Sequence, residues 1–303
     1  MNFKYQAFGV PIYSEIELKA LMPYKGTEDG IHVIVSQTPE ELQTAPNVIK
    51  PFSQFNEKEL LYKVPEIGNY YIRNGQYICI EPKIGDLDSV LLYFYSNALA
   101  AAIMQRNSIP LHVSGVLDPT GKVILFAGNS GAGKSTTATF LKSKGYSIFT
   151  DDTCVLTFEG DKCYAYASYP MTRLWNETLE HQNVYQKTEG RALRSNVEQE
   201  KFGFYFHEEF LAEKREVANI LILQEEGAKG ISIDQLSKTE AMTLLSQFVY
   251  RRQWLAGMKK NKLVFTFLTE ICKRLPVYKA VRPKGKKTFD EFSSAIAHQF
   301  LQA

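Results

Sequence analysis

The sequence predicts an α/β fold with a small β-rich N-terminal domain. Residues 1 to about 83 consist of short β-branched and aromatic runs separated by Pro, Gly and Asn, which is typical of strands. From Leu111 onward, strands alternate with a glycine loop and helices, which is typical of α/β domains. With 303 residues, of which 45% are hydrophobic, the chain can form one large or two medium domains. We expect a β-rich domain over residues 1–83 and an α/β domain over residues 84–303.

Charge and cysteine content restrict the class of protein. The 35 basic and 33 acidic residues leave a net charge of +2, so no chain-wide field attracts nucleic acid. The four cysteines have neither disulfide nor metal-ligand spacing, which favours reduced thiols and a cytoplasmic protein. The N-terminus lacks an apolar signal sequence, and Ser96 and Asn97 interrupt the longest apolar run, so we expect no membrane span.

The N-terminal part contains a clear hairpin signal. Asn74-Gly75 separates Tyr70–Arg73 from Gln76–Ile80, which predicts a two-residue type I′ turn. Asp86 or Asp88 then caps a helix that runs to about Gln105. Apolar residues cover most of the circumference of this helix, so we expect it to be buried.

The remaining elements follow from turn residues and periodicity. Two further hairpins are expected, and a strand and two helices follow them. The last helix begins at a capping box, Thr288 with Glu291. The predicted segments are Val116–Leu117 with Val123–Ala127 around a turn at Asp118–Lys122, Cys154–Phe158 with Cys163–Ala167, the strand Ala218–Leu223, and the helices Thr239–Phe248 and Phe289–Leu301.

The most specific signal is a glycine-rich loop between a strand and a helix. It matches G-x-x-x-x-G-K-[ST] and reads Gly128, Asn129, Ser130, Gly131, Ala132, Gly133, Lys134 and Ser135. Such a loop directs backbone N–H groups at phosphates, while Lys134 reaches the β- and γ-phosphates and the Ser135 hydroxyl binds Mg²⁺. With Thr136 included as a nucleotide contact, the motif predicts a P-loop nucleotide-binding core that uses ATP and Mg²⁺.

A pair of carboxylates, Asp151 and Asp152, follows Lys134 by 17 and 18 residues. A helix from Lys134 to about Lys144, ended by Gly145, would return the chain into a neighbouring parallel strand whose carboxyl end lies beside the loop. One aspartate would then serve Mg²⁺ and the other would accept a proton from an attacking hydroxyl. The alternative is a solvated strand end.

Residues 111–156, with Leu111-His112-Val113-Ser114-Gly115, the loop and the aspartate pair, resemble the HPr serine kinase family, which shares its nucleotide-binding core with phosphoenolpyruvate carboxykinase. The resemblance implies that Asp151 is the general base and that Asp152, with Ser135, is linked to the metal, although the two roles could be exchanged. It also implies that His112 lies near the transferring phosphate. HPr kinases have glycine directly after this histidine, whereas this chain has Val113, so His112 is either a site residue or a hydrogen-bonded strand residue.

Weaker landmarks resemble kinases that phosphorylate the C-terminal serine of lasso-peptide precursors. They are Phe8–Glu15, Tyr169–Trp175 and Leu275–Tyr278. HPr kinases bind HPr through a glycine-rich signature, which is not recognisable after Trp175 in this chain. The segment Lys187–Arg194 is found in that part of the sequence instead, so we do not expect HPr to be the acceptor. Three interpretations of that basic segment stay open: it folds over the phosphates, it binds an acidic peptide, or it is an ordinary exposed loop. HPr kinases assemble into rings, which leaves a homo-oligomer open.

A second basic segment covers residues 251–287, with twelve Lys or Arg against Glu270 alone. Its local charge of +11 leaves about −9 for the rest of the chain. Three interpretations stay open: a solvated face, a surface for a peptide substrate, and a nucleic-acid surface.

The sequence therefore predicts a kinase that transfers phosphate from ATP to a serine of a peptide or small protein, with Asp151, Asp152, Lys134 and His112 in the catalytic site. One alternative is a regulatory protein in which nucleotide hydrolysis changes the conformation. Another is a kinase for a small metabolite.

Overall fold

The computed structural model describes residues 2–175, 191–193, 201–227, 229–285 and 288–301. The chain forms two compact units: residues 1–110 with 250–266, and residues 111–249 with 267–303. The first unit is thus larger than the segment 1–83 expected from the sequence. It continues to Pro110 because the helical segment after residue 86 packs on strand β8 of the N-terminal sheet.

Unit 1 is built on a nine-stranded sheet with the order β3-β1-β2-β4-β9-β8-β7-β6-β5. Its pairs are antiparallel except β2 with β4 and β4 with β9. The β-rich character expected for the N-terminal part is therefore confirmed. The strands are β1 (Phe3–Ala7), β2 (Val10–Ser14), β3 (Met22–Pro23), β4 (Ile31–Val35), β5 (Val48–Lys50), β6 (Ser53–Phe55), β7 (Glu59–Val64), β8 (Gly68–Arg73) and β9 (Tyr77–Pro82).

The β8–β9 hairpin differs from the prediction by one residue. Asn74 and Gly75 both have positive φ, 55° and 63°, as a type I′ turn requires. Arg73 pairs with Tyr77, however, so Gln76 belongs to the turn and not to the strand. The amide of Gln76 donates to the carbonyl of Arg73 and closes the turn.

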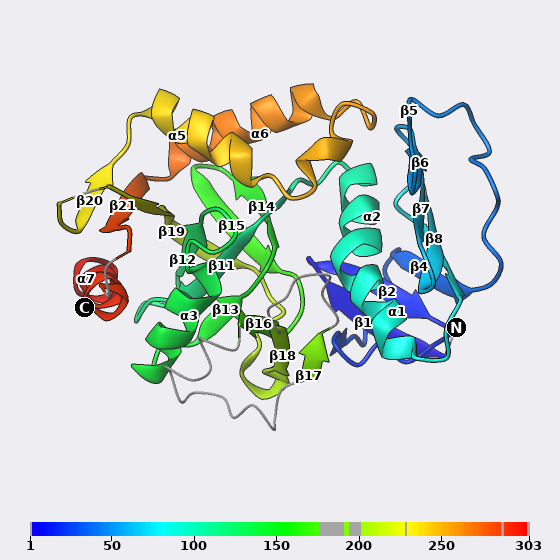
Figure 1. Ribbon diagram of the computed structural model, residues 1–303, viewed down its shortest axis with the longest axis horizontal. Helices are drawn as coiled ribbons and strands as arrows, with labels where there is room; N and C mark the ends of the chain where they lie inside the picture. The colour runs from blue at the N-terminus through cyan, green and yellow to red at the C-terminus, as the bar shows by residue number, and fades with distance from the viewer. Residues whose placement is uncertain (1, 176–190, 194–200, 228, 286–287, 302–303) are drawn as a thin grey trace. The chain divides into compact units, whose positions relative to one another are not determined.

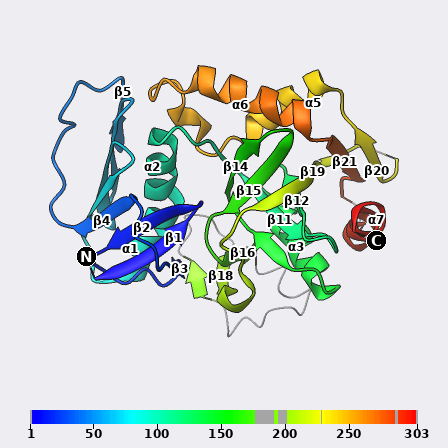
Figure 2. The ribbon, with the colours of Figure 1, turned by 180° about the vertical axis from the view of Figure 1, so that it is seen from behind.

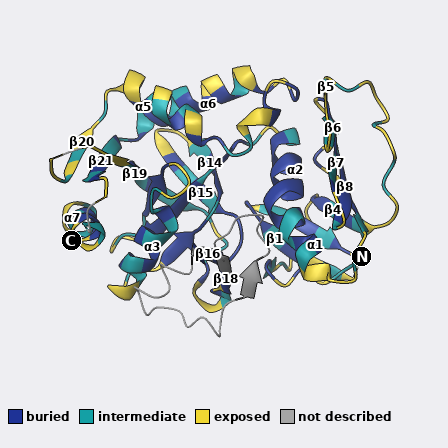
Figure 3. Ribbon diagram, viewed as in Figure 1, coloured by how far each residue is buried: buried dark blue, intermediate teal, exposed yellow. Residues whose placement is uncertain are grey.

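A helical segment packs on this sheet and is largely buried (Figure 3). It consists of α1 (Leu87–Tyr93), a π-helical turn (Phe94–Ala98) and α2 (Leu99–Gln105), and the Asp86 side chain caps its N-terminus. Within the described residues, Leu87–Gln105 is the one helical run long and apolar enough to cross a membrane, and 72% of its apolar window is buried inside the protein. The predicted burial is confirmed.

Unit 2 contains a mixed sheet with the order β10-β14-β15-β19-β12-β11-β13, extended by β21 and β20 beside β19. Strands β12, β19 and β21 are parallel and end at one edge. A separate sheet has the order β16-β18-β17. The strands are β10 (Pro110–Leu111), β11 (Val113–Leu117), β12 (Val123–Ala127), β13 (Ile148–Thr150), β14 (Cys154–Glu159), β15 (Lys162–Ala167), β16 (Met171–Trp175), β17 (Arg191–Leu193), β18 (Lys201–Tyr205), β19 (Arg215–Glu226), β20 (Ser232–Gln235) and β21 (Val277–Pro283).

Helices cover both faces of this mixed sheet. Figures 1 and 2 show α3 (Lys134–Ser143) and α7 (Phe289–Phe300) on one face, and α5 (Lys238–Leu245) with the second half of α6 (Asn261–Arg274) on the other. The capping box expected at Thr288 is absent, because Thr288 has φ −110° and ψ 13° and its side chain makes no capping hydrogen bond. Ser237 and Glu240 instead form a capping box at α5, which the sequence reading missed.

The strand that precedes the aspartate pair also lies elsewhere than expected. We predicted β13 as a direct parallel neighbour of β12, but β13 pairs antiparallel with β11. The tight β11–β12 hairpin fills the position beside β12, so β11 separates the two strands. Because β13 and β12 are both antiparallel to β11, they still run in the same direction, and their carboxyl ends meet at the same edge.

Candidate functional site

The glycine loop connects β12 to α3, as the motif predicts. Gly131 and Gly133 have φ of 84° and 95°, values that L-residues with a side chain rarely adopt. A β-carbon built on Gly128 would lie 2.8 Å from the carbonyl oxygen of Leu223 on β19, so only glycine fits there. Helix α3 ends at Ser143, and Gly145 follows its C-cap residue Lys144. Gly145 has a φ of 95° and donates an amide hydrogen bond to the Lys142 carbonyl, so it terminates the helix as expected.

Lys134 is folded back onto the loop. Its side chain is 7% exposed, and Nζ donates to the carbonyl oxygens of Gly128 at 2.8 Å and Asn129 at 3.4 Å. A buried ammonium group held by the loop's own carbonyls lies where it can reach a bound phosphate by a change of rotamer.

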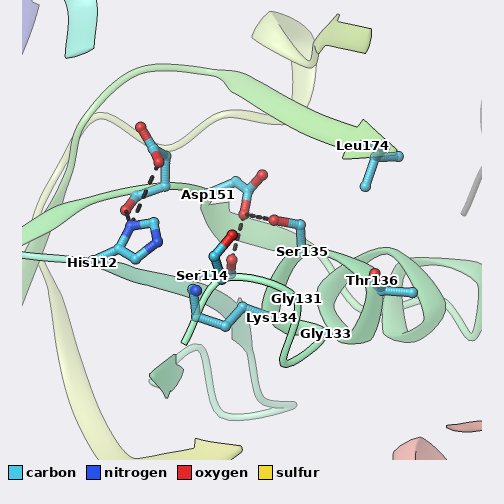
Figure 4. A pocket seen from close by; sticks show the side chains of 11 residues that line it. His112, Ser114, Gly131, Gly133, Lys134, Ser135, Thr136, Asp151 and Leu174 are labelled. Atoms are coloured by element: carbon cyan, nitrogen blue, oxygen red, sulfur yellow. Dashed lines mark hydrogen bonds and ion pairs between the residues drawn. The ribbon is translucent and has the colours of Figure 1, made fainter. Parts of the chain in front are cut away.

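Asp151 accepts hydrogen bonds from three side-chain hydroxyls, and it is 1% exposed. One oxygen, Oδ1, accepts hydrogen bonds from the hydroxyls of Ser114 and of Ser135, the latter at 2.8 Å. The other oxygen, Oδ2, accepts from Thr172 on β16 at 2.8 Å. Three strands and α3 therefore meet at one carboxylate, which lies beside the glycine loop (Figure 4).

Asp152 forms a pair with His112. Nδ1 of His112 lies 2.8 Å from the backbone oxygen of Asp152 and 3.6 Å from its Oδ1. Because a carbonyl oxygen can only accept, Nδ1 carries the proton, and in this tautomer of the neutral ring Nε2 is the nitrogen that can accept a proton. Burial lowers the pKa of His112, against the opposing effect of the Asp152 carboxylate. The φ of 77° at Asp152 is an uncommon, strained value for a residue with a side chain.

These groups line one pocket (Figure 4). Its wall contains the following residues: His112, Ser114, Ser130, Gly131, Gly133, Lys134, Ser135, Thr136, Asp151, Asp152 and Leu174. The structure thus brings together His112, both aspartates, Lys134 and most of the loop. Gly128, Asn129 and Ala132 belong to the loop but do not line the pocket. The amide of Ala132 donates to the carbonyl of Asn129.

Ser114, Thr172 and Leu174 are pocket residues to which the sequence reading gave no role. Ser114 lies on β11, two residues after His112, so its position beside the loop could have been inferred from alternation along the strand. Thr172 and Leu174 lie on the separate three-stranded sheet. No local pattern in the sequence relates that sheet to Asp151.

The basic stretch 251–287 is divided between the two units, and several of its cations are paired with acidic or polar partners. The pairs are Lys259 with Glu57, Lys260 with Asn107, Lys273 and Arg274 with Glu270, Lys279 with Glu226, and Arg282 with Glu225. Its net charge is therefore partly compensated by residues distant in the sequence. Of the other basic segment, Lys187 and Arg194 lie outside the described residues.

The chain matches no protein-family model and no curated protein. Among solved structures it is similar to the HPr(Ser) kinase/phosphatase from Coxiella burnetii, with 10% sequence identity over 62% of this chain and 95% of that one, and a TM-score of 0.30. A TM-score this low reflects a loose superposition and identifies neither the fold nor the activity.

Proposed function

We propose that this protein is an ATP- and Mg²⁺-dependent kinase that transfers the γ-phosphoryl group to a serine hydroxyl of a peptide. The observation that carries the proposal is the 2.8 Å hydrogen bond between Ser135 and Asp151 at the start of α3. A hydroxyl at the end of a glycine loop, paired with a buried carboxylate from another strand, is the arrangement that phosphoryl-transfer sites use to hold a metal-bound triphosphate.

The donor set suits Mg²⁺. Ser135 and Asp151 offer hard oxygen ligands, and Mg²⁺ binds through one or two such groups together with substrate phosphates and water. Among the described residues, no group of three His, Cys, Asp or Glu side chains lies together in a way that could hold a metal ion. When bound, the ion would neutralise charge that develops on the phosphate oxygens.

The contacts favour an exchange of the two aspartate roles expected from the sequence. Asp151 accepts hydrogen bonds from three hydroxyls, one of which is that of Ser135, so we propose it as the carboxylate linked to the metal. Asp152 holds His112, so we propose this pair as the proton acceptor. The hydroxyl oxygen of the substrate serine forms a bond to the γ-phosphorus of ATP, and the bond between that phosphorus and the β,γ-bridging oxygen breaks. The proton of the substrate hydroxyl passes to Nε2 of His112.

The acceptor is proposed on the resemblance in sequence, which implies the C-terminal serine of a lasso-peptide precursor. The cytoplasm is the proposed compartment, and the four cysteines, all buried free thiols, agree with it. Since many cations of the basic stretch have partners, we expect that stretch to contribute little to acceptor binding, and it gives no support for a nucleic-acid partner.

The proposal is tested by following three products after the protein is incubated with Mg²⁺-ATP and a serine-ended peptide. A kinase gives ADP and phosphopeptide in equal amounts, whereas a nucleotide-hydrolysing regulatory protein gives ADP and free phosphate with or without peptide. Amidating the peptide's C-terminus tests recognition of the free carboxylate, because each lost exposed ion pair weakens binding by about 0.2–1 kcal/mol. ADP formation that no peptide increases would contradict the proposed acceptor.

A further inference from the structure

The two flanks of the glycine loop differ in chemistry. Helix α3 contacts β16 on one side and α7 on the other, and Figure 1 shows it between them. Asp151 and its partner Thr172 lie on the β16 side. Since the reacting phosphate belongs beside Asp151, a triphosphate that follows the loop extends its nucleoside end toward the α7 side.

An aromatic ring lies on that side. Phe289, the first residue of α7, is half-buried, and its Cε2 would be 3.5 Å from a β-carbon built on Gly133 of the loop. The guanidinium of Arg282, at the end of β21, lies over this ring, 5.8 Å from its centroid. Glu225 forms an ion pair with Arg282 and fixes its position.

The topology places these groups at the edge where ligands bind in α/β sheets. Glu225 and Arg282 are neighbours in the register of the parallel strands β19 and β21. Strand β12, which leads into the loop, is parallel to β19 on its other side. The carboxyl ends of these strands, and the starts of α3 and α7, therefore share one edge of the sheet.

We propose that Arg282 and Phe289 form a platform that binds the aromatic base of the nucleotide, an inference that rests on the proposed nucleotide-binding function. Planar guanidinium groups and aromatic rings both stack on nucleobases, because every base presents a π-face. The ion pair with Glu225 holds the guanidinium over the ring. Recognition of the nucleoside thus comes from the C-terminal elements, separately from the glycine loop.

The experiment compares ATP with inorganic tripolyphosphate, which lacks the nucleoside, by calorimetry in the presence of Mg²⁺. The unmodified protein is expected to bind ATP more tightly than tripolyphosphate. Phe289→Leu keeps an apolar side chain against α3 and should weaken ATP binding roughly tenfold, the scale of one lost stacking contact, while tripolyphosphate binding changes less than about twofold. Phe265→Leu, at a ring that is 62% exposed on α6, is the matched control and should change neither affinity.

Each other outcome overturns the inference in a distinguishable way. Equal weakening of both ligands by Phe289→Leu would mean that the ring only supports the loop, and unchanged ATP affinity would mean that it touches no base. If Phe289→Leu does not fold, Arg282→Lys, which retains the charge but loses the planar group, gives the same comparison. If the unmodified protein binds tripolyphosphate as tightly as ATP, the proposed base platform is contradicted, but the proposed binding of phosphates by the glycine loop is not. Binding of neither ligand would instead contradict the proposed function.

Discussion

Two buried carboxylates, one in each unit, show how differently the same group can be used. Glu59 in unit 1 is 2% exposed and Asp151 in unit 2 is 1% exposed. Glu59 accepts from the backbone amides of Gln43 and Thr44 as well as from the hydroxyls of Thr44 and Tyr71. The protein hydrogen bonds that Asp151 accepts from Ser114, Ser135 and Thr172 all come from hydroxyls.

The difference lies in the donors. A backbone amide can only donate and cannot turn away, so Glu59 holds residues 43–44 against strand β7 in one geometry. A hydroxyl rotates and can also accept or bind a cation, so the surroundings of Asp151 can rearrange around a ligand. The amide donors therefore fix the surroundings of Glu59, whereas the three hydroxyls leave Asp151 able to take part in binding a ligand.

The largest expected effect comes from Lys134→Ala, which removes the ammonium group from the pocket that contains Asp151. Phosphoryl transfer should fall by about 10²–10³-fold or more, the scale for a lost charge-stabilising donor, while the free energy of unfolding changes little. Turnover and urea denaturation measured on the same preparation separate the two quantities. Transfer at the parent rate would exclude the loop as the active site.

His112→Gln should lower turnover by about 10²-fold, as expected for loss of a general base. Burial lowers the pKa of His112 below its ordinary 6.5, so the ring is neutral at pH 7 and loses its acceptor only when protonated. The parent's turnover should therefore fall as the pH falls through that lowered pKa, and the variant should lack this decline. His32→Gln, at a ring stacked on Tyr13 in unit 1, is the control and should keep it.

Glu59→Gln tests whether the buried carboxylate of unit 1 stabilises the fold. Burial alone raises the pKa of Glu59, but the hydrogen bonds from Thr44, Tyr71 and Gln43 outweigh it and lower the pKa to about 2. A lowered pKa stabilises the fold above the ordinary value of 4.5, and this stabilisation is lost as the pH falls toward 2. Urea denaturation at pH 7 should show a loss of about 2–3 kcal/mol that narrows on acidification, with unchanged turnover per folded molecule. If the difference in unfolding free energy between the parent and Glu59→Gln is the same at all pH values, the ionised Glu59 carboxylate is not the source of the stabilisation.

The smallest effects should come from removing single hydroxyls. Thr172→Val and Thr44→Val each delete one donor to a buried carboxylate and should cost about 1 kcal/mol of unfolding free energy. Only Thr172→Val should also lower turnover, by several-fold, because Asp151 then loses part of its orientation. Equal turnover in both variants would show that the hydroxyls around Asp151 are merely structural.

The sequence predicted the features that depend on neighbouring residues. The loop between β12 and α3, the end of α3 at Gly145 and the positive φ values at Asn74-Gly75 all follow from glycine's conformational freedom. The length of one helix and one strand predicted an aspartate pair beside the loop, but the residue that contacts Ser135 is Asp151 and not Asp152, which the resemblance had linked with Ser135.

What the sequence could not predict depends on long-range pairing. Strand β11 lies between β12 and β13 because it pairs with both of them. The alternation of side chains along a strand does not show which strands will be neighbours. Thr172 reaches Asp151 from another sheet. At Thr288 the S/T-x-x-E pattern is present, but the backbone before α7 is not extended, so the capping box does not form.

The central claim is that Ser135 and Asp151 hold the metal that accompanies the nucleotide. The most direct measurement is ATP affinity with Mg²⁺ and with excess chelator, for the parent, Ser135→Ala and Asp151→Asn. All three should bind free ATP alike, and only the parent should gain affinity when Mg²⁺ is added. A gain of the same size in both variants would contradict the account.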